Sequence, residues 1–224
     1  MHYKNEVCVE RLYSMCEKKH LKILVRNEKE RDYRRVEEIA RAAFFTPWRI
    51  ENGKIGCPYE HWMVNELRKR DGVLELSLVA EIDGVVVGHV ICNNATVTTS
   101  DITIPVLNIG PVSVMPEYQR QGVGKTMMTE LIRKAKELGY GAFLFFGRPE
   151  YYPKFGFKEA SVFGITDMKG DNCPPFMGME LIPGYLTTAK GGKFYEGDIF
   201  EDELNREKVK KFDEEFMSCV VKGT

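Results

Sequence analysis

Hydrophobic residues follow two different periods along the chain, and each period predicts one kind of element. From 74 to 82 (LELSLVAEI), apolar residues recur at every second position, which is typical of a β-strand. Asp83-Gly84 separates this stretch from a second one, VVVGHVICN. Because Asp-Gly favours a tight turn between paired strands, the two stretches predict a β-hairpin.

The clearest helical period runs from 123 to 138 and ends before Gly139, a typical C-terminal stop. Its apolar stripe consists of Val123, Met127, Leu131, Ala135 and Leu138, with Met128 and Ile132 beside it. A predicted strand at 105–114 precedes this helix, and a short apolar stretch at 141–147 follows it. Strand, helix and strand in this order predict a right-handed crossover between parallel neighbours.

The remaining segments complete a mixed fold. Further strands are predicted at 21–26 and 174–182, helices at 28–44, 59–70 and 202–216, and a loop at 46–58. In the last helix, Leu204, Val209 and Phe212 are expected to pack inward. We therefore expect an α/β (α+β) fold, in which a mixed central sheet with antiparallel N-terminal strands carries helices on both faces.

Composition limits the function classes. The 224 residues are 43% hydrophobic and carry a net charge of -1, which argues against nucleic acid or an anionic membrane as partner. No stretch has the roughly 18 apolar residues of a membrane span, and the first twenty residues do not read as a signal peptide, so we expect a cytoplasmic protein. Six cysteines are scattered without a CxxC pair, and Cys8, Cys16 and His20 lack a fourth ligand, so no metal site is predicted.

The segment QRQGVGK, from Gln119 to Lys125, is the strongest chemical signal. Glycines followed by a helix start can turn backbone N–H groups toward a phosphate. Gly122 and Gly124 are too close together for a Walker A loop, and Met127 stands where a dinucleotide-binding fingerprint needs its third glycine. Taken alone, the segment is also compatible with a turn that binds no ligand.

A longer motif narrows the interpretation. VSVMPEYQRQGVGKTMM resembles the signature of the Gcn5-related N-acetyltransferase (GNAT) superfamily, which combines V-x-V, PEYQ and Q/R-x-x-G-x-G/A. Tyr152, four residues before Gly156-Phe157, is similar to the second element of that family, and GRPEYYPKFGF resembles its YhbS-like bacterial subgroup. The resemblance covers about residues 74–160, and more loosely 22 to roughly 200.

The resemblance implies acetyl-CoA as co-substrate and no metal. Its pyrophosphate would meet the loop, and its pantetheine arm would run beside the strand at 107–114, splayed from its parallel neighbour at 141–147. Gly110-Pro111 suits a bulge there. The implied cofactor-binding residues are Val112, Ser113, Val114, Gln119, Arg120, Gln121, Gly122, Val123, Gly124 and Lys125.

For catalysis, the resemblance implies that the backbone N–H of Val114 stabilises the oxyanion and that Tyr152 protonates the departing thiolate. Tyr151 is expected to pack. The general base stays unassigned among Glu66, Glu81, His89 and Asn108. No His–Asp pair is apparent beside Cys92 or Cys173, so direct transfer is preferred to an acetyl-cysteine intermediate. Gly147-Arg148-Pro149 departs from relatives that carry an Asn there, which puts that one contact in doubt.

We expect an N-acetyltransferase acting on a primary amine, with a small molecule as first choice of acceptor. The loop and helix at 46–62 (Trp48, Tyr59, Trp62), the segment at 96–104 and the C-terminal tail would wall the acceptor site. A non-catalytic CoA-binding protein and an enzyme for longer acyl groups are the alternatives. The predicted organisation is an N-terminal extension (1–20), an acetyltransferase domain (21–185) and a C-terminal extension (186–224), with a homodimer through that last region as one expectation.

Overall fold

The computed structural model describes residues 22–45 and 59–222; the predicted arm at 1–20 and loop at 46–58, with Trp48, lie outside them. The main elements, in chain order, are β1 (Ile23–Asn27), α2 (Tyr33–Phe44), α4 (Tyr59–Lys69), β2 (Gly72–Ile82), β3 (Val85–Thr98), β4 (Thr103–Val114), α5 (Val123–Glu137), β5 (Ala142–Phe146), β6 (Lys158–Glu159), β7 (Phe176–Glu180), β8 (Lys193–Tyr195) and α6 (Asp202–Lys222). Within the described ranges, no helix is both long and apolar enough to cross a membrane.

The strands form one sheet in the order β1-β2-β3-β4-β5-β7-β6, and β8 pairs with β3 outside this path. All the named strand pairs are antiparallel except β4 with β5. The hairpin predicted at Asp83-Gly84 joins β2 to β3, and the parallel pair on either side of α5 is also as predicted. The expected mixed sheet is therefore confirmed.

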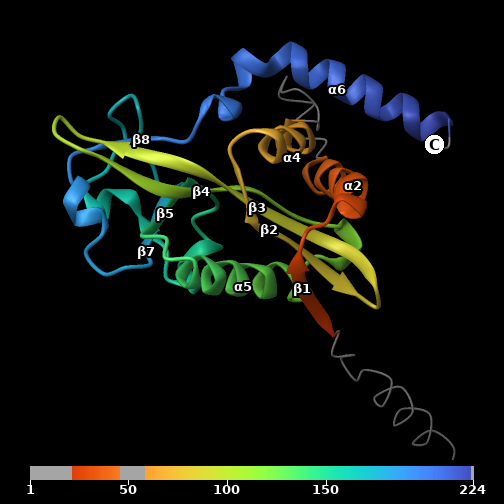
Figure 1. Cartoon of the computed structure of the whole chain (residues 1–224), viewed down its shortest axis with the longest axis horizontal. Coiled ribbons are helices and arrows are strands. Elements are labelled where there is room, and N and C mark those ends of the chain that lie inside the picture. Colours follow the sequence, from red (N-terminus) through yellow and green to blue (C-terminus); the bar gives the residue numbers. More distant parts are fainter. Residues whose placement is uncertain (1–21, 46–58, 223–224) are drawn as a thin grey trace, which may run out of the picture.

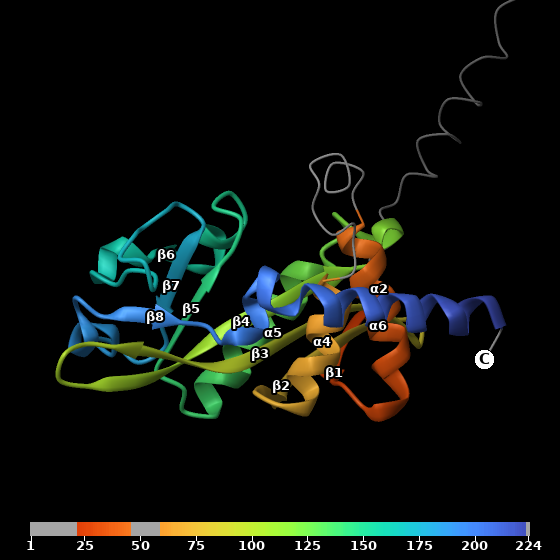
Figure 2. The ribbon, with the colours of Figure 1, turned by 90° about the horizontal axis from the view of Figure 1, so that it is seen from above.

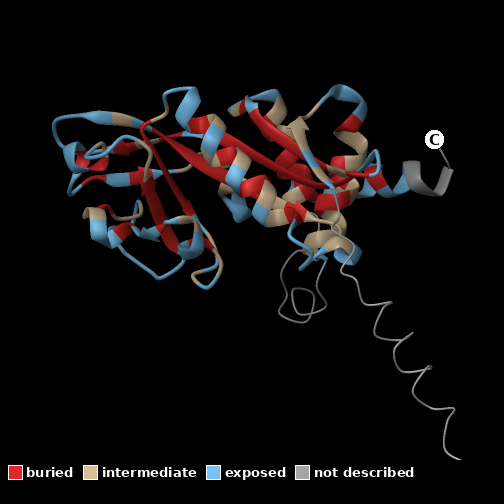
Figure 3. Cartoon of the chain, turned by 90° about the horizontal axis from the view of Figure 1, so that it is seen from below, coloured by how far each residue is buried: buried red, intermediate tan, exposed pale blue. Residues whose placement is uncertain are grey.

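Helices cover both faces of the sheet. Figure 1 shows α2, α4 and α6 above the strands and α5 below them. The core under α5 is made of Val123, Met127 and Leu131 packed on sheet residues such as Leu78 and Val90. A second core joins α2, α4 and α6 to the opposite face, and a third fills the end of the sheet that carries β5, β7 and β8. Figure 3 shows the buried residues concentrated along the long strands and the inner helix faces.

The C-terminal segment packs on this framework in two ways. β8 pairs with β3 at Thr96–Thr98, beyond the point where β2 has ended. Figure 2 shows α6 crossing over α4, and Val209 and Phe216 of α6 are buried. The hydroxyl of Tyr59 on α4 donates a 2.7 Å hydrogen bond to the carbonyl of Ile199, which ties the segment before α6 to the domain.

Two predicted packing positions were wrong. Leu204 is 61% exposed, because α6 turns Asn205 inward instead. The Asn205 amide donates to the carbonyls of Asp198 (2.7 Å) and Glu201 (3.1 Å), and these bonds set the rotation of the helix. Leu138 is 50% exposed because α5 ends at Glu137.

A buried polar cluster joins β1 to α4, β2 and β3. Arg68 donates to the Glu28 carboxylate at 2.5 Å, and the Ser77 hydroxyl donates to the same carboxylate at 2.6 Å. Since that hydroxyl has one proton, it must accept from His89 Nε2, 3.0 Å away. Burial alone would raise the pKa of Glu28, but the nearby His89, whose Nε2 lies 3.6 Å from the carboxylate, and the hydrogen bond from Arg68 outweigh it and lower this pKa to about 2. The ionised carboxylate therefore stabilises the fold.

Replacing Glu28 by Gln should destabilise the protein by about 3 kcal/mol at pH 7, the free energy of a pKa lowered from 4.5 to about 2. Because the folded pKa lies below the unfolded one, the wild-type advantage is complete above pH 4.5 and disappears as pH falls toward 2. Urea unfolding at pH 7 and pH 3 measures both. Exposed Glu203→Gln is the control, and an equal loss at the two pH values would contradict the assignment.

Candidate functional site

The end of β4 contains the bulge that the sequence predicts. Ile109 pairs with Cys92 and Val112 pairs with Val90, so Gly110 and Pro111 both lie opposite Ile91. A Cβ on Gly110 would lie 3.0 Å from the Ile91 carbonyl oxygen, which explains glycine at this position. The bulge resets the register of the last part of β4, and that register decides where its backbone groups point.

Val112 and Val114 turn their backbone groups away from β3. The N–H of Met115 donates to the Val87 carbonyl at 2.9 Å, which makes Gly88 and Val114 a non-hydrogen-bonded pair. By strand alternation, Val112 is oriented like Val114, whereas Ser113 pairs its backbone with His89. Of this V-S-V triplet, Ser113 is therefore the member whose backbone groups point toward β3, and its side chain is buried.

β5 does not form hydrogen bonds with the backbone groups at the end of β4. The parallel pairing between them consists of Leu107 with Phe143, although β4 continues to Val114 and β5 to Phe146. Past that point the strands diverge, as the resemblance implies. The backbone edge of Val112 and Val114 therefore faces a gap rather than a neighbouring strand.

At this end of the gap, α5 begins with open N–H groups. Arg120 (φ 59°) and Gly122 (φ 94°) both adopt the left-handed conformation, and Gly122 is the residue before the first helical turn. The N–H of Thr126 donates to the Gly122 carbonyl at 3.0 Å, so the helical bonds start there. The N–H groups of Val123, Gly124 and Lys125 come earlier and have no intrahelical acceptor, which makes them an anion site at the positive end of the helix.

Some side chains of the loop stabilise it through hydrogen bonds, and others add positive charge. The Gln119 amide donates to the Val114 carbonyl at 2.9 Å, and the Gln121 amide donates to the Glu117 carbonyl at 2.6 Å. Val123 is buried in the core, so only its backbone can meet a ligand. Arg120 and Lys125 are exposed and place positive charge beside the open N–H groups.

Tyr152 begins a short 3₁₀ helix (Tyr152–Phe155) that follows β5. Its ring packs edge-on against Phe145 (4.6 Å), Tyr151 (5.0 Å) and Phe157 (5.8 Å), and the residue is 9% exposed. Burial raises the pKa of the Tyr152 hydroxyl well above its usual range. The hydroxyl therefore holds its proton throughout the neutral pH range and can donate it to a stronger base.

Strand, helix and 3₁₀ helix converge at Gly124. A Cβ on Gly124 would lie 2.8 Å from the hydroxyl oxygen of Tyr151 and 3.8 Å from Cγ2 of Val114. Tyr151, expected only to pack, thus reaches the start of α5 across the gap, and the Tyr-Tyr pair beside a Gly-x-Gly loop is the signal that could have indicated this. The anion site, the open edge of β4 and the Tyr151-Tyr152 pair form one constellation.

The structure separates the four candidates for the general base. His89 is fully buried and belongs to the Glu28 cluster. Glu81, on β2, forms a 2.6 Å ion pair with Arg26 on the neighbouring strand β1. Glu66 pairs with Lys69 on α4 at 3.1 Å. Asn108 alone lies on β4, next to the last position paired with β5, and it is not ionisable. None of the four thus combines an ionisable group with a place at the gap.

The structure describes the side chains of two cysteines, Cys92 and Cys173. Cys92 is fully buried, and burial raises the pKa of its thiol, which disfavours the nucleophilic thiolate. Cys173 is exposed. Within the part of the chain that the structure describes, no group of three or more His, Cys, Asp or Glu residues could hold a metal ion.

Comparison with known proteins points to one family. Residues 33–157 match the model described as the acetyltransferase (GNAT) family. The uncharacterized N-acetyltransferase YjhQ of Escherichia coli (strain K12) is 34% identical over 87 residues, 38% of this chain and 48% of YjhQ. The chain therefore spans about half the length of this relative.

Two crystal structures share the fold. The GNAT family N-acetyltransferase YhbS from Escherichia coli, in complex with CoA, matches with a TM-score of 0.67 and 23% identity, over 81% of this chain and 93% of that one. A GNAT family acetyltransferase from Brucella melitensis, in complex with acetyl-CoA, gives 0.59 and 23%, over 80% and 97%.

The left-handed backbone at Gly122 yields a direct test of the loop. Gly122→Ala should cost about 1 to 2 kcal/mol of stability, because a Cβ disfavours a φ of 94°. Gly122→Asn should cost less, since Asn tolerates this conformation better. Chemical denaturation of both variants measures the difference. Equal stability of Ala, Asn and wild type would mean that the loop does not hold this conformation.

Proposed function

Because the chain belongs to the acetyltransferase (GNAT) family, as its motifs predict, we propose that it moves an acetyl group from acetyl-CoA to a primary amine, directly and within a ternary complex. One observation supports the proposal: the start of α5 at Gly124 lies beside Val114, on the free edge of β4, and beside Tyr151, whose ring packs on Tyr152. Each of these features matches one chemical requirement of acetyl transfer from a thioester of CoA.

The residues present fit acetyl-CoA. The N–H groups of Val123, Gly124 and Lys125 would hold the pyrophosphate, assisted by the positive charge of Arg120 and Lys125. The outward backbone groups of Val112 would pair with an amide of the pantetheine arm, as a neighbouring strand would, and the outward N–H of Val114 would remain for the thioester. The backbone groups of Ser113 pair with β3, so Ser113 would not bind the pantetheine arm.

In the reaction, acetyl-CoA supplies an activated acetyl group as its thioester. The N–H of Val114 would donate a hydrogen bond to the thioester carbonyl oxygen, where negative charge develops during attack by the amine. The hydroxyl of Tyr152 would donate its proton to the departing thiolate. The raised pKa of Tyr152 keeps its hydroxyl protonated at neutral pH, so the hydroxyl can donate a hydrogen bond to the sulfur as negative charge develops there.

Binding of acetyl-CoA tests the cofactor site. Isothermal titration should give micromolar affinity for acetyl-CoA and for CoA, and Gly124→Trp should abolish both, because its side chain fills the space between α5 and Tyr151. Thr129→Trp, at an exposed position of the same helix, is the matched control. Absence of binding to the wild-type protein would overturn the proposed function.

Tyr152→Phe tests the catalytic assignment. With an amine found by screening, we expect kcat to fall by about 10² to 10⁴, while the affinity for acetyl-CoA changes little. Tyr140→Phe is the matched control, since Tyr140 follows the far end of α5. CoA release followed with a thiol reagent measures both variants. A kcat within twofold of wild type for Tyr152→Phe would remove this residue from the mechanism.

A further inference from the structure

Tyr151 carries a hydroxyl that no described residue uses. Its oxygen lies 2.8 Å from the point where a Cβ on Gly124 would lie, at the start of α5. Within the described ranges, no group forms a hydrogen bond with this hydroxyl. Burial raises its pKa, so the hydroxyl stays protonated at neutral pH and can donate a hydrogen bond. A half-buried donor of this kind, placed at the gap, is available to a ligand.

Three contacts hold the ring that carries this hydroxyl. The ring packs edge-on against Tyr152, with 5.0 Å between ring centres, and against Phe155, with 5.5 Å. Nζ of Lys154 lies 3.6 Å from the centre of the ring, which is the geometry of a cation–π contact. The hydroxyl is therefore held in place before a ligand arrives, and this reduces the entropy that a contact with the ligand costs.

The hydroxyl is close to the open N–H groups of α5. A Cβ lies about 2.5 Å from the nitrogen of its own residue, so the Tyr151 oxygen is at most about 5.3 Å from the nitrogen of Gly124. A phosphate oxygen that accepts from that nitrogen takes up about 2.9 Å of this distance. The Tyr151 hydroxyl is thus next to the atoms that are bonded to the phosphate.

Under the proposed function, this position lies along the path of the pantetheine arm. The arm would join a pyrophosphate at the start of α5 to a sulfur atom beside Tyr152. Tyr151 is near both places, because its hydroxyl lies beside Gly124 and its ring packs on Tyr152. The arm carries one hydroxyl and two amide carbonyl groups, and all three accept hydrogen bonds.

We propose, on the basis of the proposed function, that the Tyr151 hydroxyl donates a hydrogen bond to an oxygen of the pantetheine arm and thereby favours ligands that carry this arm. Tyr151 is a binding residue, whereas Tyr152 beside it acts at the sulfur. A nucleotide that ends at the pyrophosphate does not gain from Tyr151, because it has no arm to meet the hydroxyl.

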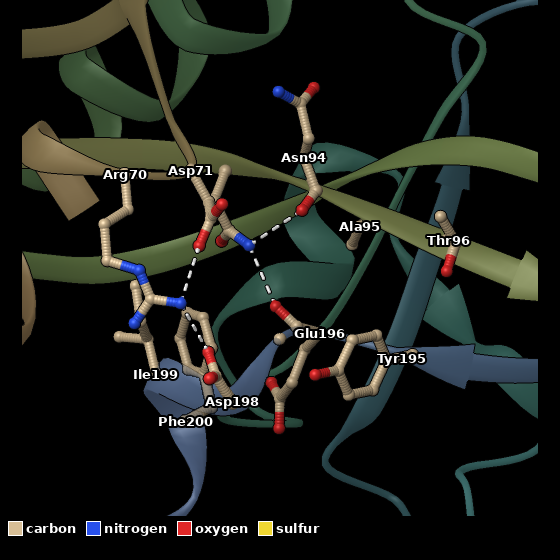
Figure 4. A pocket seen from close by; sticks show the side chains of 12 residues that line it. Arg70, Asp71, Asn94, Ala95, Thr96, Tyr195, Glu196, Asp198, Ile199 and Phe200 are labelled. Atoms are coloured by element: carbon tan, nitrogen blue, oxygen red, sulfur yellow. Dashed lines mark hydrogen bonds and ion pairs between the residues drawn. The ribbon is translucent and has the colours of Figure 1, made fainter. Parts of the chain in front are cut away.

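A cavity of about 310 Å³ at the edge of β3, where β2 has ended, does not compete for the cofactor. Figure 4 shows the charged residues around it: Arg70, Asp71, Glu196 and Asp198. The guanidinium already pairs with two of the carboxylates, at 2.9 Å and 3.7 Å. In the wall, the Asn93 amide donates to the Glu196 carbonyl at 2.9 Å and accepts from Asn108 at 3.1 Å. Three carboxylates against one guanidinium repel phosphate, so titration with CoA reports the gap.

Titration of the full-length protein with two ligands locates the contact: CoA, and adenosine 3′-phosphate 5′-diphosphate, which keeps the pyrophosphate of CoA but lacks the arm. Tyr151→Phe should weaken CoA about five- to tenfold, the effect of one lost hydrogen bond, and leave the nucleotide within about twofold of wild type. With an amine found by screening, KM for acetyl-CoA should rise in parallel, while kcat stays within about twofold. This split separates Tyr151 from Tyr152, whose removal lowers kcat.

Tyr140→Phe, beyond the far end of α5, is the matched control and should bind both ligands as the wild type does. Unchanged affinity of Tyr151→Phe for CoA, or an equal loss for CoA and the nucleotide, would overturn the contact with the arm while the proposed function stands. A fall in kcat comparable to that of Tyr152→Phe would place the hydroxyl at the reacting atoms and overturn the contact as well. If CoA does not bind to the wild type, the proposed function fails, and the contact fails with it.

Discussion

The incomplete pairing of β4 is the constraint from which the candidate site follows. A buried strand normally satisfies its N–H and C=O groups on both edges. β4 does so toward β3, but it meets β5 in register at Leu107 and Phe143 and then continues for seven residues beyond that position. The backbone edge of Val112 and Val114 therefore remains available, and a ligand that carries amide groups of its own can complete the sheet there. Pro111, which has no N–H, occupies the bulge without adding a further unpaired donor.

The two faces of the sheet contribute different chemistry to the gap. Below the sheet, α5 starts beside Val114 and brings its positive end and its open N–H groups. At the end of β5, the chain turns back through Tyr151 and Tyr152, whose rings close the same region with apolar contacts and raise the pKa of both hydroxyls by burial. The open N–H groups of α5 and the Tyr151 hydroxyl are thus placed next to each other by the same crossover, strand to helix to strand, that builds the core.

The C-terminal segment covers the part of the β3 edge that β2 leaves unpaired. β8 extends the edge of β3 after β2 has ended, and the following residues cover Asn93, whose amide holds them through the Glu196 carbonyl.

Local signals were sufficient for part of this description. The Asp83-Gly84 hairpin, the α5 stripe from Val123 to Ala135, the bulge at Gly110-Pro111 and the glycine loop before α5 could all be predicted, because each depends on residues adjacent in the chain. The family motifs indicated Tyr152 in the same way. The assignment of a general base could not be made by these means, since it requires knowing which side chains share a face and which are consumed in ion pairs.

Tertiary structure decided the rest. That Ser113 faces β3 while Val112 and Val114 face the gap depends on strand register after the bulge, and one residue of shift would reverse it. The inward turn of Asn205 in place of Leu204 depends on carbonyls at Asp198 and Glu201. The hydrogen bonds that join Asn108, Asn93 and Glu196 span 103 positions of sequence. Sequence by itself determined the elements and the glycine loop before α5, because their energies are local; the arrangement of Asn108, Asn93 and the segment at Glu196 arose only in the folded chain, because hydrogen bonds between distant segments orient them.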